Sequence, residues 1–244
     1  GFRVRFRDAG HILGSAILEV WIREEDREAK VVFSGDLGPQ QTVMERNPAF
    51  IEDADVVVIE STYGNRLHKS NQETRAEFRG VMNAALKEHS KVLIPTFAVD
   101  RAQRILYELA LMQQEGLFRD GIPIYFDSPM GVKATEIYKD HLSLMSAEIQ
   151  EQLRKDQDPY SPIGLRYVER VEDSQAINAV ESAIVLAGSG MCNGGRIVHH
   201  LKHNLWKRNT HVIFVGYQAQ GTLGRRLVEG EKTVRVAGEE VEVK

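Results

Sequence analysis

The sequence has almost no cysteine, no long apolar run and no strong excess of either charge. Its single cysteine, Cys192, excludes an intramolecular disulfide and fits a reducing compartment. The longest apolar runs, at 56–59 and 211–216, are only long enough for strands, so no membrane-spanning segment is expected. The first residues also show no signal-peptide pattern. Together these absences favour a cytoplasmic protein.

Charge is nearly balanced, with 31 Lys and Arg against 35 Asp and Glu, for a formal net charge of −4. Proteins that bind nucleic acid nonspecifically usually carry a basic excess, so this balance is a mild argument against such a protein. Any nucleic-acid contact would have to be a local groove. A chain of 244 residues with 42% hydrophobic content can form one large domain, or one domain plus part of another.

Apolar segments separated by polar turns predict a sheet-rich opening. Strands are expected at 2–7, 15–22, 30–34 and 55–59, with the charged segment 24–28 as a hairpin turn. From about residue 65, strands and helices alternate. Their nearly continuous apolar strands, such as 183–187, predict a parallel sheet covered on both faces.

Helix signals in this second part are specific. Ser70 and Glu73 form a possible capping box, and an apolar stripe follows at Phe78, Val81, Met82, Ala85 and Leu86. Further helices are expected after Asp100, from Ser128 and Pro129, and over 196–205. The alternating segment 233–243 predicts a hairpin that returns to the first sheet.

Three short segments each place one polar residue among glycines and small residues after an apolar strand. DAGHILGSA at 8–16 supplies His11, SGDLG at 34–38 supplies Asp36, and ESTYG at 60–64 supplies Glu60. Imidazole and carboxylate are zinc ligands in hydrolytic sites, and loops at strand ends can bring them together. Taken singly, each residue has an ordinary alternative as a loop histidine, a turn aspartate or a capping acid.

A family resemblance extends over almost the whole chain. It is carried by the same three segments and by four others: PTFAVDRAQ at 95–103, DSPM at 127–130, LAGSGMCNGGRIVHH at 186–200 and FVGYQAQGTLGR at 214–225. They resemble metallo-β-lactamase-fold nucleases that carry a β-CASP domain. The resemblance is strongest to bacterial and archaeal RNA-processing relatives of the endonuclease subunit that cleaves pre-mRNA 3′ ends. It implies an α/β fold that combines part of an αββα metallo-β-lactamase sheet with a β-CASP domain, whose mainly parallel sheet is flanked by helices.

From this resemblance we expect a partial metallo-β-lactamase domain at 1–64, a β-CASP domain at 65–230 and a return to the first domain at 231–244. His11 and Asp36 would be metal ligands, with Asp36 and Glu60 in catalytic roles. The cofactor would be two zinc ions that activate a hydroxide for attack on RNA phosphorus. The expected partner is single-stranded RNA rather than a membrane, and a homodimer is left open.

The glycine loop before the helix at 196–205 predicts a phosphate site, because backbone N–H groups at a helix start favour anions. By resemblance, Gly188, Ser189, Gly190 and Arg196 are candidates for contacts with the RNA backbone. A tight turn is the ordinary alternative for such a loop. Arg101 is a further RNA-binding candidate, and its alternative is an ion pair with Asp100, Glu108 or another acidic residue at the edge of the core.

The family's His-x-His-x-Asp-His motif and its two later histidine motifs do not occur in this sequence. We therefore expect the intact protein to be a nuclease and this piece to be inactive. The alternative is a noncatalytic RNA-binding or scaffold member of the family, and the presence of both His11 and Asp36 argues against it. A metal site at His199, His200 and His203 is disfavoured, because at most two of them can share a helix face and His200 lies on the apolar side.

Overall fold

The structure is a computed structural model that describes residues 1–40, 42–65, 67, 69–118, 121–155 and 158–244. Its internal contacts divide the chain into two compact units. Unit 1 comprises residues 1–74 and 140–157, and unit 2 comprises residues 75–139 and 158–244. No described helix is both long enough and apolar enough to cross a membrane.

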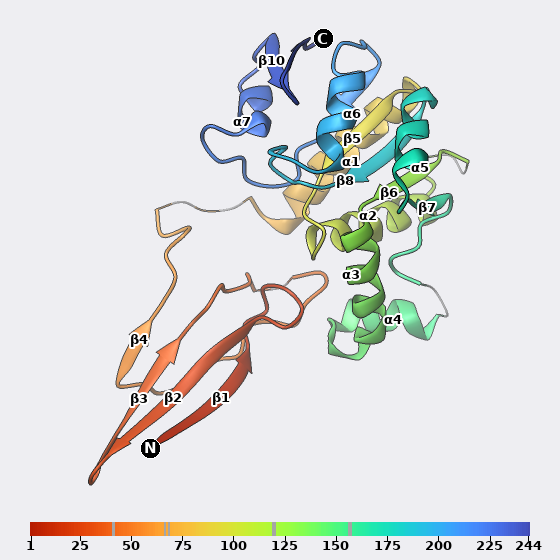
Figure 1. The fold of residues 1–244 in the computed structure, drawn as a ribbon. Coiled ribbons are helices and arrows are strands. Elements are labelled where there is room, and N and C mark those ends of the chain that lie inside the picture. Colours follow the sequence, from red (N-terminus) through yellow and green to blue (C-terminus); the bar gives the residue numbers. More distant parts are fainter. Residues whose placement is uncertain (41, 66, 68, 119–120, 156–157) are drawn as a thin grey trace. The chain divides into compact units, whose positions relative to one another are not determined.

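Unit 1 contains a four-stranded sheet in the order β1-β2-β3-β4 (Figure 1). Its strands are β1 (Phe2–Asp8), β2 (Ala16–Glu24), β3 (Arg27–Phe33) and β4 (Val56–Val58). The first two pairings are antiparallel, and β3 pairs with β4 in parallel. Because β3 and β4 run the same way, both end at the same edge of the sheet, which is where two of the predicted motifs begin.

The apolar cluster at the sheet of unit 1 is small. It consists of the buried residues Ala9, Ile17 and Val32, with Leu37 and Ile51 packed against them. Met44, Met145 and Ile149 are buried elsewhere in this unit. All three residues of β4 are exposed, although their apolar sequence is typical of a buried strand. Much of the apolar surface of this sheet is therefore uncovered in the described chain.

Residues 140–157 also pack in unit 1, as the short helix η1 (Leu142–Leu144) and α4 (Ala147–Arg154). The N–H of Ser146 donates to the carbonyl of Met44 at 2.7 Å, and Arg46 donates to the carbonyl of Ser143 at the same distance. The sequence placed this segment inside the domain at 65–230. These hydrogen bonds to distant residues, which no local pattern reveals, place it with the first unit instead.

Unit 2 is built on a five-stranded, fully parallel sheet in the order β7-β6-β8-β5-β9. Its strands are β5 (Lys91–Pro95), β6 (Ile124–Asp127), β7 (Leu165–Tyr167), β8 (Ala183–Ala187) and β9 (Thr210–Val212). The parallel sheet flanked by helices confirms the predicted fold class. Parallel strands direct their carboxyl ends to one edge, so the loops after β5, β6, β8 and β9 lie along it.

Helices cover both faces of this sheet (Figure 1). Alternate residues of β5 show the division: Val92 and Ile94 pack with α1 (Asn71–Lys87) and α2 (Arg101–Gln114), whereas Leu93 packs with α6 (Arg196–Asn204). The remaining helices are α3 (Pro129–Asp140), α5 (Val171–Ala176), η2 (Ile177–Ala179) and α7 (Leu223–Val228).

The C-terminal hairpin pairs β10 (Thr233–Val236) with β11 (Glu239–Glu242), as the alternation of the sequence predicts. It does not join the first sheet. Its buried residues Val234, Val236 and Val241 belong to the same apolar cluster as α6, so its contacts place it in unit 2. A two-stranded hairpin needs a partner surface to be stable, and α6 and α7 supply it.

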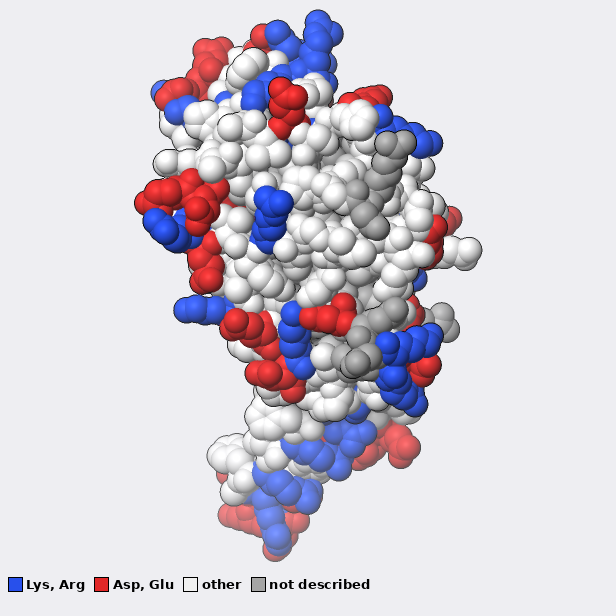
Figure 2. Space-filling model, turned by 90° about the vertical axis from the view of Figure 1, so that its right-hand side faces the viewer, with Lys and Arg blue, Asp and Glu red and all other residues white. Residues whose placement is uncertain are grey.

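Charge is distributed on the surface as the sequence balance suggests. On the face shown in Figure 2, Lys and Arg side chains are interspersed with Asp and Glu, and much of the visible surface is uncharged. The described residues therefore present no broad basic patch on that face, and an anionic partner would need a local site.

Candidate functional site: two sets of strand-end loops

The loop at 9–15, which carries His11, is a tight turn between β1 and β2. Gly10 and Gly14 have positive φ angles of 63° and 87°, a region that glycine adopts without strain. The N–H of Gly10 donates to Asp8 Oδ1 at 2.9 Å, and Ser15 Oγ accepts from the N–H of His11 at 3.1 Å. The small polar residues around His11 therefore fix the backbone from which its ring projects.

The loop at 34–38, which carries Asp36, lies directly against this first loop. The N–H of Gly38 donates to the carbonyl of Ala9 at 2.8 Å. A Cβ atom at position 38 would lie only 1.7 Å from the carbonyl oxygen of Gly10, so only glycine allows the two backbones to approach so closely. Asp36 itself is exposed.

Glu60 joins the third segment to the second. Its Oε1 accepts from the N–H of Leu37 at 2.8 Å, and its own N–H donates to Ser34 Oγ at 3.0 Å. The hydrogen bond from Leu37, one from the Thr62 hydroxyl and the nearby His11 ring all lower the pKa of Glu60. The structure thus brings together the three loops that carry His11, Asp36 and Glu60, and Glu60 is held in its ionised form.

The chemistry of these donors suits zinc, but the set is incomplete. Among the residues that the structure describes, no group of three or more His, Cys, Asp or Glu side chains is placed to hold a metal ion. A catalytic zinc ion normally has three protein ligands, and His11 and Asp36 supply two. The described residues therefore do not form a metal centre by themselves, and the ligand roles of these two residues stay predictions.

In unit 2, a second set of loops meets at the carboxyl edge of the parallel sheet. These are the β5–α2 loop (96–100), the glycine loop (188–195) and the β9–α7 loop (213–222). The N–H of Thr96 donates to the carbonyl of Ala187 at 3.0 Å, and Gln218 Nε2 donates to the carbonyl of Gly190 at 3.0 Å. Three of the segments that carry the family resemblance are therefore neighbours in space.

The glycine loop is closed largely on itself. The N–H of Ser189 donates to the carbonyl of Gly194 at 3.1 Å, and the N–H of Ile197 donates to the carbonyl of Gly188 at 2.9 Å. These two groups are therefore not free for an anion. Gly195 is the N-cap residue before α6 and has a φ angle of 74°, and a Cβ there would lie 2.4 Å from the carbonyl oxygen of Gly188. Much of the glycine content is thus explained by a tight turn, and RNA contact by Gly188, Ser189 and Gly190 stays a prediction.

Arg101 does not form the ion pairs with Asp100 or Glu108 that the sequence left open, because both acids pair with other arginines. Asp100 pairs with Arg104 at 2.9 Å, and Glu108 pairs with two arginines of α1. Arg101 is exposed at the first turn of α2, and the described residues give its guanidinium no ion-pair partner. It remains available to an anion.

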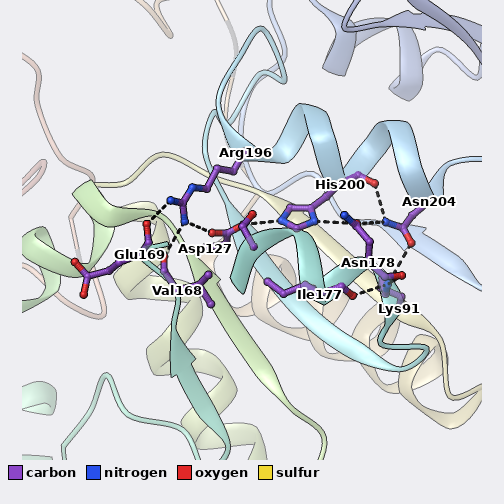
Figure 3. Close-up of polar contacts among 10 residues, drawn as sticks. Lys91, Asp127, Val168, Glu169, Ile177, Asn178, Arg196, His200 and Asn204 are labelled. Atoms are coloured by element: carbon purple, nitrogen blue, oxygen red, sulfur yellow. Dashed lines mark hydrogen bonds and ion pairs between the residues drawn. The ribbon is translucent and has the colours of Figure 1, made fainter. Parts of the chain in front are cut away.

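Arg196, in contrast, is turned inward (Figure 3). Its guanidinium forms an ion pair with Asp127 and donates to the carbonyls of Val168, at 2.9 Å, and Glu169. The side chain is only 20% exposed. This geometry gives Arg196 a structural role between β6, α6 and the segment after β7, and its role in RNA binding stays a prediction.

Asp127 is the fully buried centre of this polar network. Burial alone would raise the pKa of its carboxyl, but hydrogen bonds from His200, Ser174 and Arg196 outweigh that effect and lower it. His200 Nε2 lies 2.7 Å from Asp127 Oδ2, and only 1% of the His200 side chain is exposed. The prediction that His200 packs inward is confirmed.

The network continues from His200 through Asn178 and Asn204 to Lys91 (Figure 3). Lys91 Nζ donates to Asn204 Oδ1 at 3.2 Å and to the carbonyl of Ile177 at 3.0 Å. Burial lowers the pKa of Lys91 to about 8. Sequence patterns do not reveal this network, because its members are far apart in the chain. The one sequence signal for it is an aspartate at a strand end together with a histidine on the apolar face of a helix.

Comparison with known proteins adds to this geometry. The model of the β-CASP domain matches residues 102–227, slightly more than half of the chain. The chain belongs to the metallo-β-lactamase-fold β-CASP RNA nuclease family. This confirms the family resemblance that the sequence motifs carry, and the family is typically metal-dependent.

Relatives of this β-CASP chain extend beyond it. A protein named as a ribonuclease in Thermus thermophilus is 41% identical over 237 residues, which cover 97% of this chain and 53% of that protein. An RNase J-like protein of Methanocaldococcus jannaschii is 32% identical over 237 residues, or 96% and 53%. The transcription termination factor FttA of Pyrococcus abyssi is 33% identical over 244 residues, or 98% and 37%. The chain therefore spans about half the length of the first two relatives.

Proposed function

We propose that the protein to which this β-CASP chain belongs hydrolyses phosphodiester bonds of single-stranded RNA with zinc. The observation that carries the proposal is the direct contact between the loops of His11 and Asp36, with Glu60 hydrogen-bonded to the second loop. If these residues were only a loop histidine, a turn aspartate and a capping acid, their three strand-end loops would have no reason to meet at one point. The ribonuclease name of a relative that matches nearly the whole chain supports the same reaction.

In this proposal His11 and Asp36 are two ligands of a zinc centre whose other ligands lie outside this chain. Zinc in such a centre acts as a Lewis acid that polarises a phosphoryl oxygen. Glu60 keeps the Asp36 loop in place through Leu37, and its negative charge lies close to His11. Arg101 and the glycine loop supply local contacts with the RNA backbone, which fits a chain without a basic excess.

The test compares this chain with a protein that extends it to the full length of its relatives. The 244-residue chain with added zinc should neither hold the metal tightly nor cleave single-stranded RNA, because two ligands do not complete a zinc site. The longer protein should do both. Asp36→Ala in the longer protein should abolish cleavage while its circular dichroism spectrum is retained.

Asp26→Ala is the matched control, since Asp26 is an exposed aspartate in the β2–β3 turn. It should leave cleavage unchanged. Zinc-dependent cleavage by the 244-residue chain that survives Asp36→Ala would show that the metal site is elsewhere. A longer protein that binds RNA and zinc but never cleaves would favour the noncatalytic scaffold instead.

A further inference from the structure

Phe97 is a half-exposed aromatic side chain at the carboxyl edge of the unit 2 sheet. It follows β5 after one buried residue, Thr96, and 50% of its surface is accessible. Neighbouring apolar residues of β5 are fully buried, so the chain turns Phe97 out of the core at this point. An exposed ring at this edge is not needed for packing the sheet.

The ring of Phe97 lies against the glycine loop. A Cβ atom at position 190 would be 2.9 Å from both Cδ2 and Cε2 of Phe97, so any residue other than glycine there would strike the ring. Gly190 is also held by Gln218, whose neighbour Tyr217 is 53% exposed. Two exposed rings therefore lie on loops that adjoin the same glycine, one packed beside it and the other hydrogen-bonded to it through Gln218.

A cation follows the Phe97 loop directly. Arg101 is four residues after Phe97, at the start of α2, and its guanidinium is exposed. Proteins that hold single-stranded nucleic acid combine aromatic rings, on which bases stack, with cations that contact the backbone. The arrangement of ring, cation and glycine loop matches those two requirements at one edge of the sheet.

We propose that Phe97 is a stacking platform for a base of single-stranded RNA, with Tyr217 as a second ring, while Arg101 contacts a phosphate. This inference rests on the proposed function and adds Phe97 and Tyr217 to it, two residues that lie within the segments of the family resemblance but had no role of their own. Stacking accepts any base, since every base has a π face, so the platform would bind RNA with little sequence preference.

The experiment measures binding of the 244-residue chain to a short fluorescent oligouridylate, and to the same ribose-phosphate backbone without bases, by anisotropy at several salt concentrations. Removal of the bases should weaken binding to the wild type by at least the roughly 5- to 150-fold that one stacked base contributes. Phe97→Leu should weaken binding to the oligouridylate over the same range with an unchanged salt slope, and should not weaken binding to the base-free backbone further. Phe97→Tyr keeps the ring and should bind normally.

Arg101→Gln should act differently, lowering the salt slope by about 0.7 for a single strand and weakening both probes alike. Trp206→Leu is the matched control, since Trp206 is 52% exposed but precedes β9 at the opposite edge of the sheet. It should leave binding of both probes unchanged.

Wild-type binding of RNA that is unaffected by Phe97→Leu, or equally weakened on both probes, would overturn the stacking role and leave the proposed function intact. If the wild type binds neither probe at low salt, RNA binding by this chain fails and the stacking role fails with it. The comparison of wild type on the two probes needs no substitution, so it stands even if a Phe97 variant unfolds.

Discussion

At the scale of single residues, Asp127 shows how a buried charge can stabilise this fold. It lies at the end of β6 and pairs with Arg196, while His200 and Ser174 donate to its other oxygen. Removing one partner of a buried ion pair leaves the other charge without compensation, which costs about 3–5 kcal/mol. We expect Asp127→Ala to lower the free energy of unfolding by that amount, measured by urea denaturation.

Asp173→Ala provides the comparison, because Asp173 is an exposed aspartate of α5 close to Ser174. Its effect should stay within about 0.5 kcal/mol, as for most surface substitutions. Equal effects of the two substitutions would mean that the Asp127 network contributes nothing to stability. Arg196→Ala should resemble Asp127→Ala if the guanidinium acts mainly inside the protein.

At the scale of elements, three neighbouring strands of unit 1 share one buried carboxylate. Glu19 of β2 pairs with Arg5 of β1 at 2.5 Å and with Lys30 of β3 at 2.8 Å. Hydrogen bonds from Arg5 and Lys30 outweigh burial and lower the pKa of Glu19 from 4.5 to about 2. The folded state thus binds the Glu19 proton more weakly than the unfolded state, and the ion pairs tie β1, β2 and β3 together.

This shift predicts a pH dependence with a definite sign. The contribution of Glu19 to stability is complete above pH 4.5 and is lost as the pH falls towards about 2. The difference in unfolding free energy between wild type and Glu19→Gln should therefore shrink over that window in acid denaturation. Glu28→Gln is the control, because Glu28 is 52% exposed and lies 3.9 Å from Arg3. A Glu19→Gln difference that stays constant over the window would contradict the shift.

Local signals predicted several elements, although α4, β7, α5 and α7 were not predicted. The capping box is present, because the N–H of Glu73 donates to Ser70 Oγ at 3.2 Å and the N–H of Ser70 donates to Glu73 Oε2 at 2.9 Å. Ser128 Oγ accepts from the N–H of Gly131 at the start of α3. The stripe of α1 is buried at Met82, Ala85 and Leu86, but Val81 is 44% exposed. Each of these signals involves residues within one or two helical turns, which is the range that sequence periodicity can detect.

Long-range contacts were not predictable in the same way. The destination of the C-terminal hairpin and the packing of 140–157 depend on surfaces formed by distant segments. The motifs did predict that the loops of His11, Asp36 and Glu60 belong together, because small residues beside each polar residue indicate a close backbone approach. Phe97 lies in the segment 95–103 of the family resemblance, but nothing in the sequence indicated that its ring is exposed, since a phenylalanine after an apolar strand is typical of core packing.

At the scale of the whole molecule, the two units differ in how much core they bury. Unit 2 has two large apolar clusters, one on each face of its sheet, whereas the apolar cluster at the sheet of unit 1 consists of Ala9, Ile17 and Val32, with Met44, Met145 and Ile149 buried elsewhere in that unit. Several apolar residues of β1 and β4, including Phe2, Phe6 and Val57, are exposed. Because a small core supplies less hydrophobic stabilisation, we expect unit 1 to unfold before unit 2.

The two tryptophans make this expectation measurable, since Trp21 lies in unit 1 and Trp206 in unit 2. Trp206→Phe leaves a reporter on the first unit, and Trp21→Phe leaves one on the second. In urea, the Trp21 signal should change at a lower concentration than the Trp206 signal. Leu106→Ala, at a fully buried position of α2, should destabilise the Trp206 transition by about 2–5 kcal/mol and leave the Trp21 transition in place.

Ile17→Ala, in the buried cluster of unit 1, should have the opposite selectivity and shift only the Trp21 transition. This pair of substitutions separates two folding units from one cooperative domain, in which any core substitution moves every probe together. A single transition that both tryptophans report, and that either substitution shifts equally, would show that the chain folds as one unit despite its separate cores. The unfolding free energy of each unit would then be replaced by a single value for the chain.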